Sequence, residues 1–264
     1  MRKRLIGVAV LLMEIVCCAF ATAYADDIHY EKITDTTVCI THAEMQGDIV
    51  NIPSEIDGYT VTGIRFDNSN AEARYIKLPH TVEQIAPGEF KDWLSLENIY
   101  MDPRNAYFFQ SDGVLYSRGD RSLHTYPCAK ADRAYTIKDG TMSIGAHAFQ
   151  NCFYLEEVEM PSSATSIGVE AFAENSVLTK CELPEGLIEI GDRAFRACRV
   201  WNGSKIPASV ETIGINPFDG CLEIARLNVA SGSACFAQID GVLFDKRSKK
   251  LISYPAAKMD EAYT

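Results

Sequence analysis

Hydrophobic residues recur every 23 positions through the second half of this 264-residue chain. Three kinds of position keep the step: an isoleucine before glycine, a phenylalanine five residues later, and an aliphatic residue that proline usually follows. They are Ile144, Ile167, Ile190 and Ile213, then Phe149, Phe172, Phe195 and Phe218, then Met160, Leu183, Ile206 and Val229. A period between about 20 and 50 residues predicts a solenoid, in which each coil buries its apolar face against its neighbours.

One coil can be followed from Val158 to Phe172. Val158 and Met160 lie two residues apart, which predicts a short β-strand, and Pro161 ends it because proline cannot donate to a ladder. The glycine after Ile167 permits a tight turn, and Phe172 then points inward. The predicted fold is a β-rich solenoid with one short parallel strand per coil, spaced roughly 4.8 Å apart. The strands are expected to centre on Asn51, Lys77, Tyr100, Thr136, Glu159, Glu182, Lys205 and Asn228.

Two insertions interrupt the short repeat. The step from Met101 to Ile137 is 36 residues, and the extra residues include an apolar stretch at 112–116, a polar turn, and Leu123. The same pattern returns 128 residues later, beginning at 240–244. Two apolar stretches around a polar turn predict a β-hairpin, so we expect two inserted hairpins.

The N-terminus has the features of a secretory signal peptide. Three basic residues at 2–4 precede a mostly apolar run from Leu5 to Ala21, and a small-x-small pattern ends at Ala25. An uncleaved membrane anchor is the alternative, although Glu14 interrupts the apolar run. Cleavage after Ala25 leaves no membrane span in the mature chain.

The predicted organisation has three parts. Residues 1–25 form the signal peptide, residues 26–47 an N-terminal cap hairpin, and residues 48–264 one repeat solenoid. The solenoid is expected to be incomplete at its C-terminus, because Tyr263–Thr264 match the opening of another strand.

The net charge of the chain restricts the classes of molecule that it can bind. The whole chain has 25 Lys and Arg against 36 Asp and Glu. Three of the bases and one acid leave with residues 1–25, so the mature chain has 22 against 35 and a net charge of −13. Such a surface repels nucleic acid and anionic lipid, which argues against a DNA, RNA or membrane-surface partner.

Seven cysteines remain in the mature chain. An odd number is a poor disulfide framework, and three of them share one repeat column with Asn175. Free, buried thiols are favoured over a bridge, and the lack of a Cys-x-x-Cys pair argues against zinc. The cysteines are Cys39, Cys128, Cys152, Cys181, Cys198, Cys221 and Cys235.

The repeat resembles that of the BspA-type leucine-rich repeat proteins. Residues 160–178 and 183–201 follow the recurring Ile-Pro-x-x-x-x-x-Ile-Gly-x-x-Ala-Phe-x-x-Cys-x-x-Leu, and Gly47–Ile64 is similar to the opening of such proteins. The Asp-Gly-Val-Leu-Tyr/Phe hairpin is also typical of the family. The resemblance covers roughly residues 28–264 and implies a leucine-rich repeat solenoid. Members look like secreted or surface proteins of bacteria and some protists, several of which bind host matrix proteins or other cells.

The sequence contains no motif for catalysis. It has no Gly-x-Ser-x-Gly, no His-Glu-x-x-His and no phosphate-binding glycine loop. The histidines are scattered, and Asp112 and Asp240 each precede glycine, so turn formation explains them. We therefore expect no enzyme activity, cofactor or metal site.

The outward positions of the predicted strands are the remaining candidate surface. Solenoids bind partners over such extended faces, and tyrosines mixed with charges resemble a protein-binding surface, although an ordinary solvated sheet is the alternative. The candidate residues are Tyr75, Lys77, Asn98, Tyr100, Glu157, Glu159, Lys180, Glu182, Lys205 and Arg226.

The expected function is an adhesin-like secreted or cell-surface binding protein, whose ligand is a protein or glycan on host or neighbouring cells. The alternative is a structural spacer within a larger surface protein that carries another domain downstream.

Overall fold

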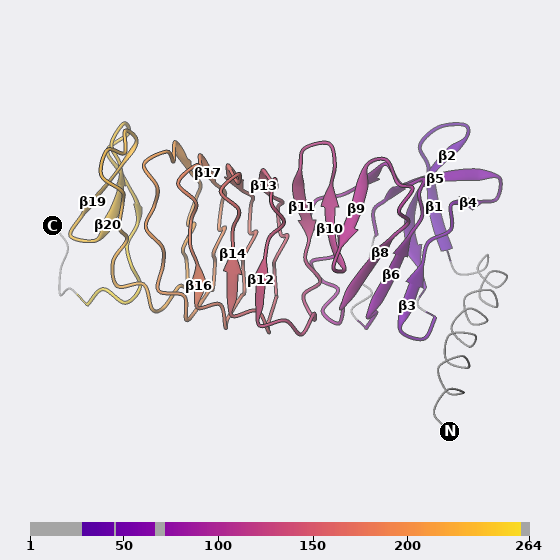
Figure 1. Cartoon of the computed structure of the whole chain (residues 1–264), viewed down its shortest axis with the longest axis horizontal. Helices are drawn as coiled ribbons and strands as arrows, with labels where there is room; N and C mark the ends of the chain where they lie inside the picture. The colour runs from indigo at the N-terminus through magenta and orange to yellow at the C-terminus, as the bar shows by residue number, and fades with distance from the viewer. Residues whose placement is uncertain (1–27, 45, 67–71, 260–264) are drawn as a thin grey trace, which may run out of the picture.

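The chain forms an elongated solenoid whose coils stack side by side from the N-terminal to the C-terminal end (Figure 1). The computed structural model describes residues 28–44, 46–66 and 72–259. Within these ranges the regular structure is entirely β-strand, and none of the chain described there forms a helix long and apolar enough to cross a membrane. The predicted signal peptide and the predicted strand opening at Tyr263–Thr264 lie outside the described residues.

The predicted strands form a parallel ladder along one side of the solenoid, here called the first ladder. Each coil adds one strand in register, so that Tyr75 pairs with Asn98 and Val158 pairs with Cys181. The first ladder is divided into two sheets, β3 (Ile49–Asn51), β6 (Tyr75–Leu78) and β8 (Asn98–Met101), then β12 (Ala134–Thr136), β14 (Glu157–Glu159) and β16 (Lys180–Cys181). Beyond β16 a single bridge, Ile206 with Val229, stands where two more strands were expected.

A second ladder lies on another side of each coil, and the sequence pattern did not predict it. It contains the isoleucine–glycine positions, and Ile144 pairs with Ile167 as Ile167 pairs with Ile190. The prediction of one strand per coil is therefore corrected to two. Its strands are β5 (Tyr59–Ile64) with β7 (Gln84–Ile85), and β13 (Ser143–Ile144), β15 (Ser166–Ile167), β17 (Glu189–Ile190) and β18 (Thr212–Ile213).

A tight turn begins at the glycines of the second ladder, as predicted, since the backbone N–H of Ala171 donates to the carbonyl of Gly168 at 3.3 Å. Close stacking of the coils, and not the turn conformation, is what requires a glycine there. Gly168 has no left-handed φ angle. A Cβ atom on Gly168 would lie 2.6 Å from the backbone N of Ala146, and one on Gly191 would lie 2.6 Å from the carbonyl carbon of Gly168. The glycine column thus lets the backbones of successive coils approach one another.

The return segment of each coil forms a third set of contacts between coils. The backbone N–H of Phe149 donates to the carbonyl of Ala171, and the N–H of Phe172 donates to the carbonyl of Ala194, both at 2.7 Å. Left-handed residues bend the segment and recur at the 23-residue step. They are His147, Glu170, Arg193 and Asn216, with Asn151, Glu174 and Ala197 in a second column.

The core of the C-terminal half is a column of stacked aromatic rings. The ring centroids of Phe149 and Phe172 are 4.9 Å apart at 9°, and those of Phe172 and Phe195 are 5.1 Å apart at 4°. All three side chains are fully buried, which confirms the prediction for Phe172 and Phe195. Trp201 replaces the repeat leucine and extends the column by stacking on Phe195 at 4.3 Å.

No disulfide joins the seven cysteines within the described residues, and five of them are buried as expected, whereas Cys39 and Cys235 are half-buried. Two thiols of the cysteine column donate to backbone carbonyls of the preceding coil, Cys198 to Phe172 and Cys221 to Phe195, each at 3.0 Å. Asn175 occupies the same column and makes three hydrogen bonds. Its amide donates to the carbonyls of Phe149 and Phe172, and its oxygen accepts the N–H of Cys152. This departure from the repeat pattern therefore joins two coils.

Both predicted hairpins are present, each with a third antiparallel strand before it. The first consists of β10 and β11, and β11 continues into the second ladder by pairing with β13. The sequence did not predict the extra strands, because their alternation is short. The two sheets are β9 (Phe108–Ser111), β10 (Val114–Ser117) and β11 (Ser122–Thr125), then β19 (Phe236–Ile239), β20 (Val242–Asp245) and β21 (Lys250–Ser253).

An antiparallel pair, β1 (Ile28–Lys32) and β2 (Thr37–Ala43), lies at the N-terminal end. β2 pairs in parallel with β5, and the short β4 (Glu55–Ile56) pairs with β5 as well. Val38 and Ile40 are fully buried, so this pair packs on the core of the first coils.

Candidate ligand-binding face

The ten candidate residues occur on the first ladder or on the coils that continue it. They alternate with buried residues such as Ile76 and Val158, because successive residues of a strand point to opposite faces. The first hairpin sheet separates them into two groups along the solenoid axis (Figure 1). The N-terminal group is Tyr75, Lys77, Asn98 and Tyr100, and the C-terminal group is Glu157, Glu159, Lys180, Glu182, Lys205 and Arg226.

The two tyrosines of the N-terminal group are in contact, as the sequence predicted. Their ring centroids are 6.2 Å apart with planes inclined at 48°, and Tyr100 is 43% exposed. Lys77 is also exposed, whereas Asn98 is half-buried against the hairpin turn, where a Cβ on Gly113 would lie 2.7 Å from its side chain. Tyr75, Lys77 and Tyr100 thus share one surface, and Asn98 is partly covered.

A charged network that the sequence analysis missed holds Tyr75 in place. The Tyr75 hydroxyl donates to Glu97 at 3.2 Å, and the Arg74 guanidinium makes two 2.8 Å hydrogen bonds to the same carboxylate. Arg74 also pairs with Asp48 at 3.3 Å. Hydrogen bonding from Arg74 lowers the pKa of Glu97, so the carboxylate stays ionised. The 23-residue step from Arg74 to Glu97 is the signal that would have placed them side by side on adjacent coils.

A shallow groove of about 380 Å³ runs along the first ladder beside these tyrosines. Lys77 and Tyr100 form part of its lining, with Pro79 and Pro103 from the turns that end the strands. The N-terminal surface therefore combines an exposed tyrosine, Tyr100, packed on the half-buried Tyr75, with one lysine and a proline-lined edge.

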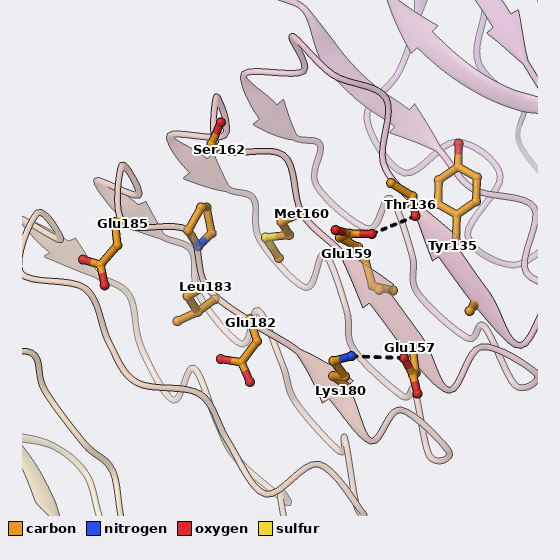
Figure 2. A pocket seen from close by; sticks show the side chains of 13 residues that line it. Tyr135, Thr136, Glu157, Glu159, Met160, Ser162, Lys180, Glu182, Leu183 and Glu185 are labelled. Carbon is orange, nitrogen blue, oxygen red and sulfur yellow. Dashed lines mark hydrogen bonds and ion pairs between the residues drawn. The ribbon is translucent and has the colours of Figure 1, made fainter.

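The C-terminal group is charged and lies beside a larger groove of about 590 Å³ (Figure 2). The Lys180 ammonium lies 3.4 Å from the Glu157 carboxylate, which joins β14 to β16. The hydroxyl of Thr136 donates to Glu159 at 3.0 Å, and the hydroxyl of Ser204 donates to Glu182 at 3.0 Å. Each of these pairs connects adjacent coils, as the repeat step requires.

Lys205 and Arg226 lie outside this groove. The first ladder is interrupted beyond β16, where the backbone N–H of Leu183 donates to the Ser204 hydroxyl at 3.1 Å. Arg226 lies beside the second hairpin sheet, since a Cβ on Gly241 would lie 3.1 Å from its side chain. The ten candidates therefore do not form one continuous surface.

The described residues contain no group of three His, Cys, Asp or Glu side chains placed to hold a metal ion. The buried thiols of Cys128 and Cys221 are unsuited to nucleophilic chemistry, because burial raises the pKa of Cys128 to about 11 and that of Cys221 to about 12. Asp112 and Asp240 adopt left-handed φ angles of 52° and 51° at the hairpin turns, which agrees with the turn role predicted for them.

Comparison with known proteins supports the repeat assignment. The sequence pattern described as "BspA type Leucine rich repeat region" matches residues 128–249 in six copies. A search of curated proteins finds no match to this chain.

Solved structures share the architecture. The pneumococcal vaccine antigen PcpA is similar with a TM-score of 0.57 at 17% identity, over 80% of this chain and 82% of that one. A leucine rich cell surface protein from Faecalibacterium prausnitzii has a TM-score of 0.54 at 25% identity, over 68% of this chain and 53% of that one. A leucine-rich repeat protein from Eubacterium ventriosum has a TM-score of 0.53 at 15% identity, over 89% and 91%. The likenesses at 15% and 17% identity show the fold alone.

Proposed function

We propose that this chain, which belongs to the BspA-type leucine-rich repeat family, is a secreted or cell-surface binding protein with an adhesin-like role. Its ligand would be a protein or glycan on host or neighbouring cells. The signal-peptide pattern at residues 1–25 supports export, and the F. prausnitzii relative is described as a cell surface protein. A repeat solenoid supports binding because it offers an extended surface to a partner.

The tyrosine pair on the first ladder, in which Tyr100 is exposed and Tyr75 half-buried, is the observation that carries this proposal. Exposed aromatic residues are enriched among the anchors that provide most of the binding energy in protein interfaces. Tyr75 is already held by its hydrogen bond to Glu97, and its ring contacts Tyr100. A partner would therefore lose little side-chain entropy when it orders these two rings.

The test is binding of labelled protein to an array of purified extracellular-matrix proteins and cell-surface glycans. The double variant Tyr75→Ala/Tyr100→Ala should lose about 2 kcal/mol or more of binding to any array member that retains the wild type. Its matched control is Phe153→Ala/Tyr154→Ala, which removes two aromatic rings that are 44% and 55% exposed and lie outside the first ladder. The control should bind as the wild type does.

Thermal unfolding of both variants separates a loss of binding from a loss of folding. The binding proposal is contradicted if no array member retains more of the wild type than of an equally acidic carrier protein. Equal affinity of the wild type and the Tyr75/Tyr100 variant for a retained ligand would rule out this face alone.

A further inference from the structure

The groove beside β12, β14 and β16 has an apolar floor and an acidic rim (Figure 2). Met160, Leu183 and Pro184 form the floor where the strands end, and Leu183 is 7% exposed. The exposed carboxylates of Glu159, Glu182 and Glu185 stand around it. With about 590 Å³ of space, the groove is large enough for more than a single side chain.

Its charge is unbalanced. Lys180 is the only base that lines the groove, and it is paired with Glu157. No ion pair to Glu159, Glu182 or Glu185 exists within the part of the chain that the structure describes. Three carboxylates therefore face this space without a basic partner.

Two of these carboxylates occupy successive positions of one column. Val158 pairs with Cys181 in the parallel ladder, so the next residues, Glu159 and Glu182, stand on adjacent coils roughly 4.8 Å apart. Like charges on neighbouring strands repel each other. Each carboxylate accepts one hydroxyl hydrogen bond through Oε2, whereas a carboxylate has about four acceptor sites, so both have capacity for a cationic donor.

We propose that this groove binds an extended polypeptide segment of the partner through an arginine or lysine side chain. The inference rests on the proposed binding function and names the chemistry of the segment. The cationic head would lie between Glu159 and Glu182 and make charge-assisted hydrogen bonds to both. Its aliphatic stem would cover Met160 and Leu183, since such side chains bury their stems on apolar surface while the head stays polar.

Charge complementarity and the apolar floor together select this occupant. An anionic segment would meet three unpaired carboxylates, and a small free polycation would use the rim and leave the floor uncovered. The aromatic ring beside the groove, Tyr135, is half-buried, and its hydroxyl is hydrogen-bonded to Tyr116 at 2.7 Å, so stacking on a sugar is not favoured.

The experiment measures fluorescence anisotropy of a short labelled peptide of alternating arginine and threonine with the purified protein. The variant Glu159→Gln/Glu182→Gln keeps the side-chain shape and removes both charges. The matched control is Glu189→Gln/Glu211→Gln, which removes two exposed carboxylates from adjacent coils at the second ladder. The groove variant should bind about tenfold more weakly than the wild type, and the control less than about twofold.

Two further probes test the occupant. A peptide with glutamine in place of arginine should bind at least about tenfold more weakly, and spermine should compete poorly, because it cannot cover the floor as a peptide does. Competition by spermine at the same concentration as the peptide would overturn the polypeptide assignment. Equal losses of peptide affinity in the groove and control variants would overturn the proposed site. The peptide would then be attracted by the net negative charge of the protein and not by the groove.

Self-association of the protein through the groove would also contradict the proposed occupant. If sedimentation shows that the wild type dimerises and the groove variant is monomeric, a second copy of the chain is the occupant. The array experiment distinguishes the two proposals. Retained matrix or glycan binding with no arginine-peptide binding sinks only the groove inference, whereas loss of both sinks the proposed function.

Discussion

The C-terminal half of the solenoid stacks its buried rings in parallel, and the N-terminal half packs them at an angle. The ring planes of Phe149 and Phe172 differ by 9°, and those of Phe172 and Phe195 by 4°. In the N-terminal half Phe90 and Trp93 meet at 84°, with centroids 5.2 Å apart. All five of these rings are fully buried or nearly so, but only the C-terminal ones repeat the same contact from coil to coil.

The difference follows from the constancy of the repeat step. From Ile144 to Ile213 the step is 23 residues in every coil, so side chains of the same type lie against one another on adjacent coils. From Ile64 to Ile85 the step is 21, and the first hairpin lengthens the step from Met101 to Ile137 to 36. When one coil is longer or shorter than the next, equivalent side chains of the two coils no longer lie directly against each other. The aromatic rings then pack edge to face, which is also a favourable arrangement.

The two halves also differ in the side chains that their grooves expose. The N-terminal groove is lined by Lys77 and by Tyr100, whose ring contacts Tyr75, and the C-terminal groove has a column of glutamates. The proposals assign the first to anchoring a partner and the second to a basic segment. The two halves would then recognise different parts of one ligand.

Removal of a stacked ring should have the largest effect. Phe195→Ala should cost about 3–5 kcal/mol, because the fully buried ring contacts Phe172, Phe218 and Trp201. Coils couple only to their neighbours, so hydrogen exchange should accelerate at residues 172–218 and change little at residues 50–80.

Phe90→Ala is the matched substitution in the other half, since this ring is 2% exposed. It should accelerate exchange around Trp93 and Phe66, its ring contacts, and leave residues 172–218 protected. Uniform loosening along the chain in either variant would contradict a core built from nearest-neighbour contacts.

A methyl group in the glycine column should have an intermediate effect. Gly168→Ala places a carbon 2.6 Å from the backbone N of Ala146, so two coils must move apart, at a cost of about 1–3 kcal/mol. Gly119→Ala is the control, because a Cβ at Gly119 has no atom of the described structure within 4 Å and its φ is not left-handed. Chemical denaturation should show a loss for the first variant only. Equal midpoints would mean that the glycine column is not set by stacking.

The smallest expected effect is a pH dependence of the stability of the N-terminal half. Hydrogen bonding from Arg104 lowers the pKa of Asp102 to about 2. Because the folded pKa lies below the unfolded one of about 3.9, this contribution to stability is present above about pH 4 and is lost as the pH falls toward 2.

Arg104→Gln should raise the Asp102 pKa toward its ordinary value and lower stability slightly at pH 6. The difference from the wild type should shrink as the pH falls to 2, because the carboxyl is then almost fully protonated in the variant and about half protonated in the wild type. Carboxyl titration by NMR, with denaturation at both pH values, measures this. An Asp102 midpoint that the substitution leaves unchanged would mean that the ion pair does not form in solution.

The sequence by itself determined the period, the solenoid and the burial of its aromatic column. These follow from side-chain chemistry that repeats at a constant step, as at Phe172 and Phe195. It also predicted both hairpins, because two apolar stretches around a polar turn are a local signal. The contact of Tyr75 with Tyr100 followed from their positions in neighbouring coils.

The tertiary structure alone decided how the coils approach one another and which outward residues share a surface. The sequence indicated a turn at the glycine of the second ladder, but only the stacked backbones show that a side chain there would clash with the adjacent coil. The ten candidate residues are one pattern in the sequence, yet the hairpin sheet covers Asn98, and the break after β16 separates Lys205 and Arg226 from the groove. The repeat step alone places the candidate residues at equivalent positions of successive coils. Whether these residues share one accessible surface depends on which of them the inserted hairpins cover and on where the first ladder ends.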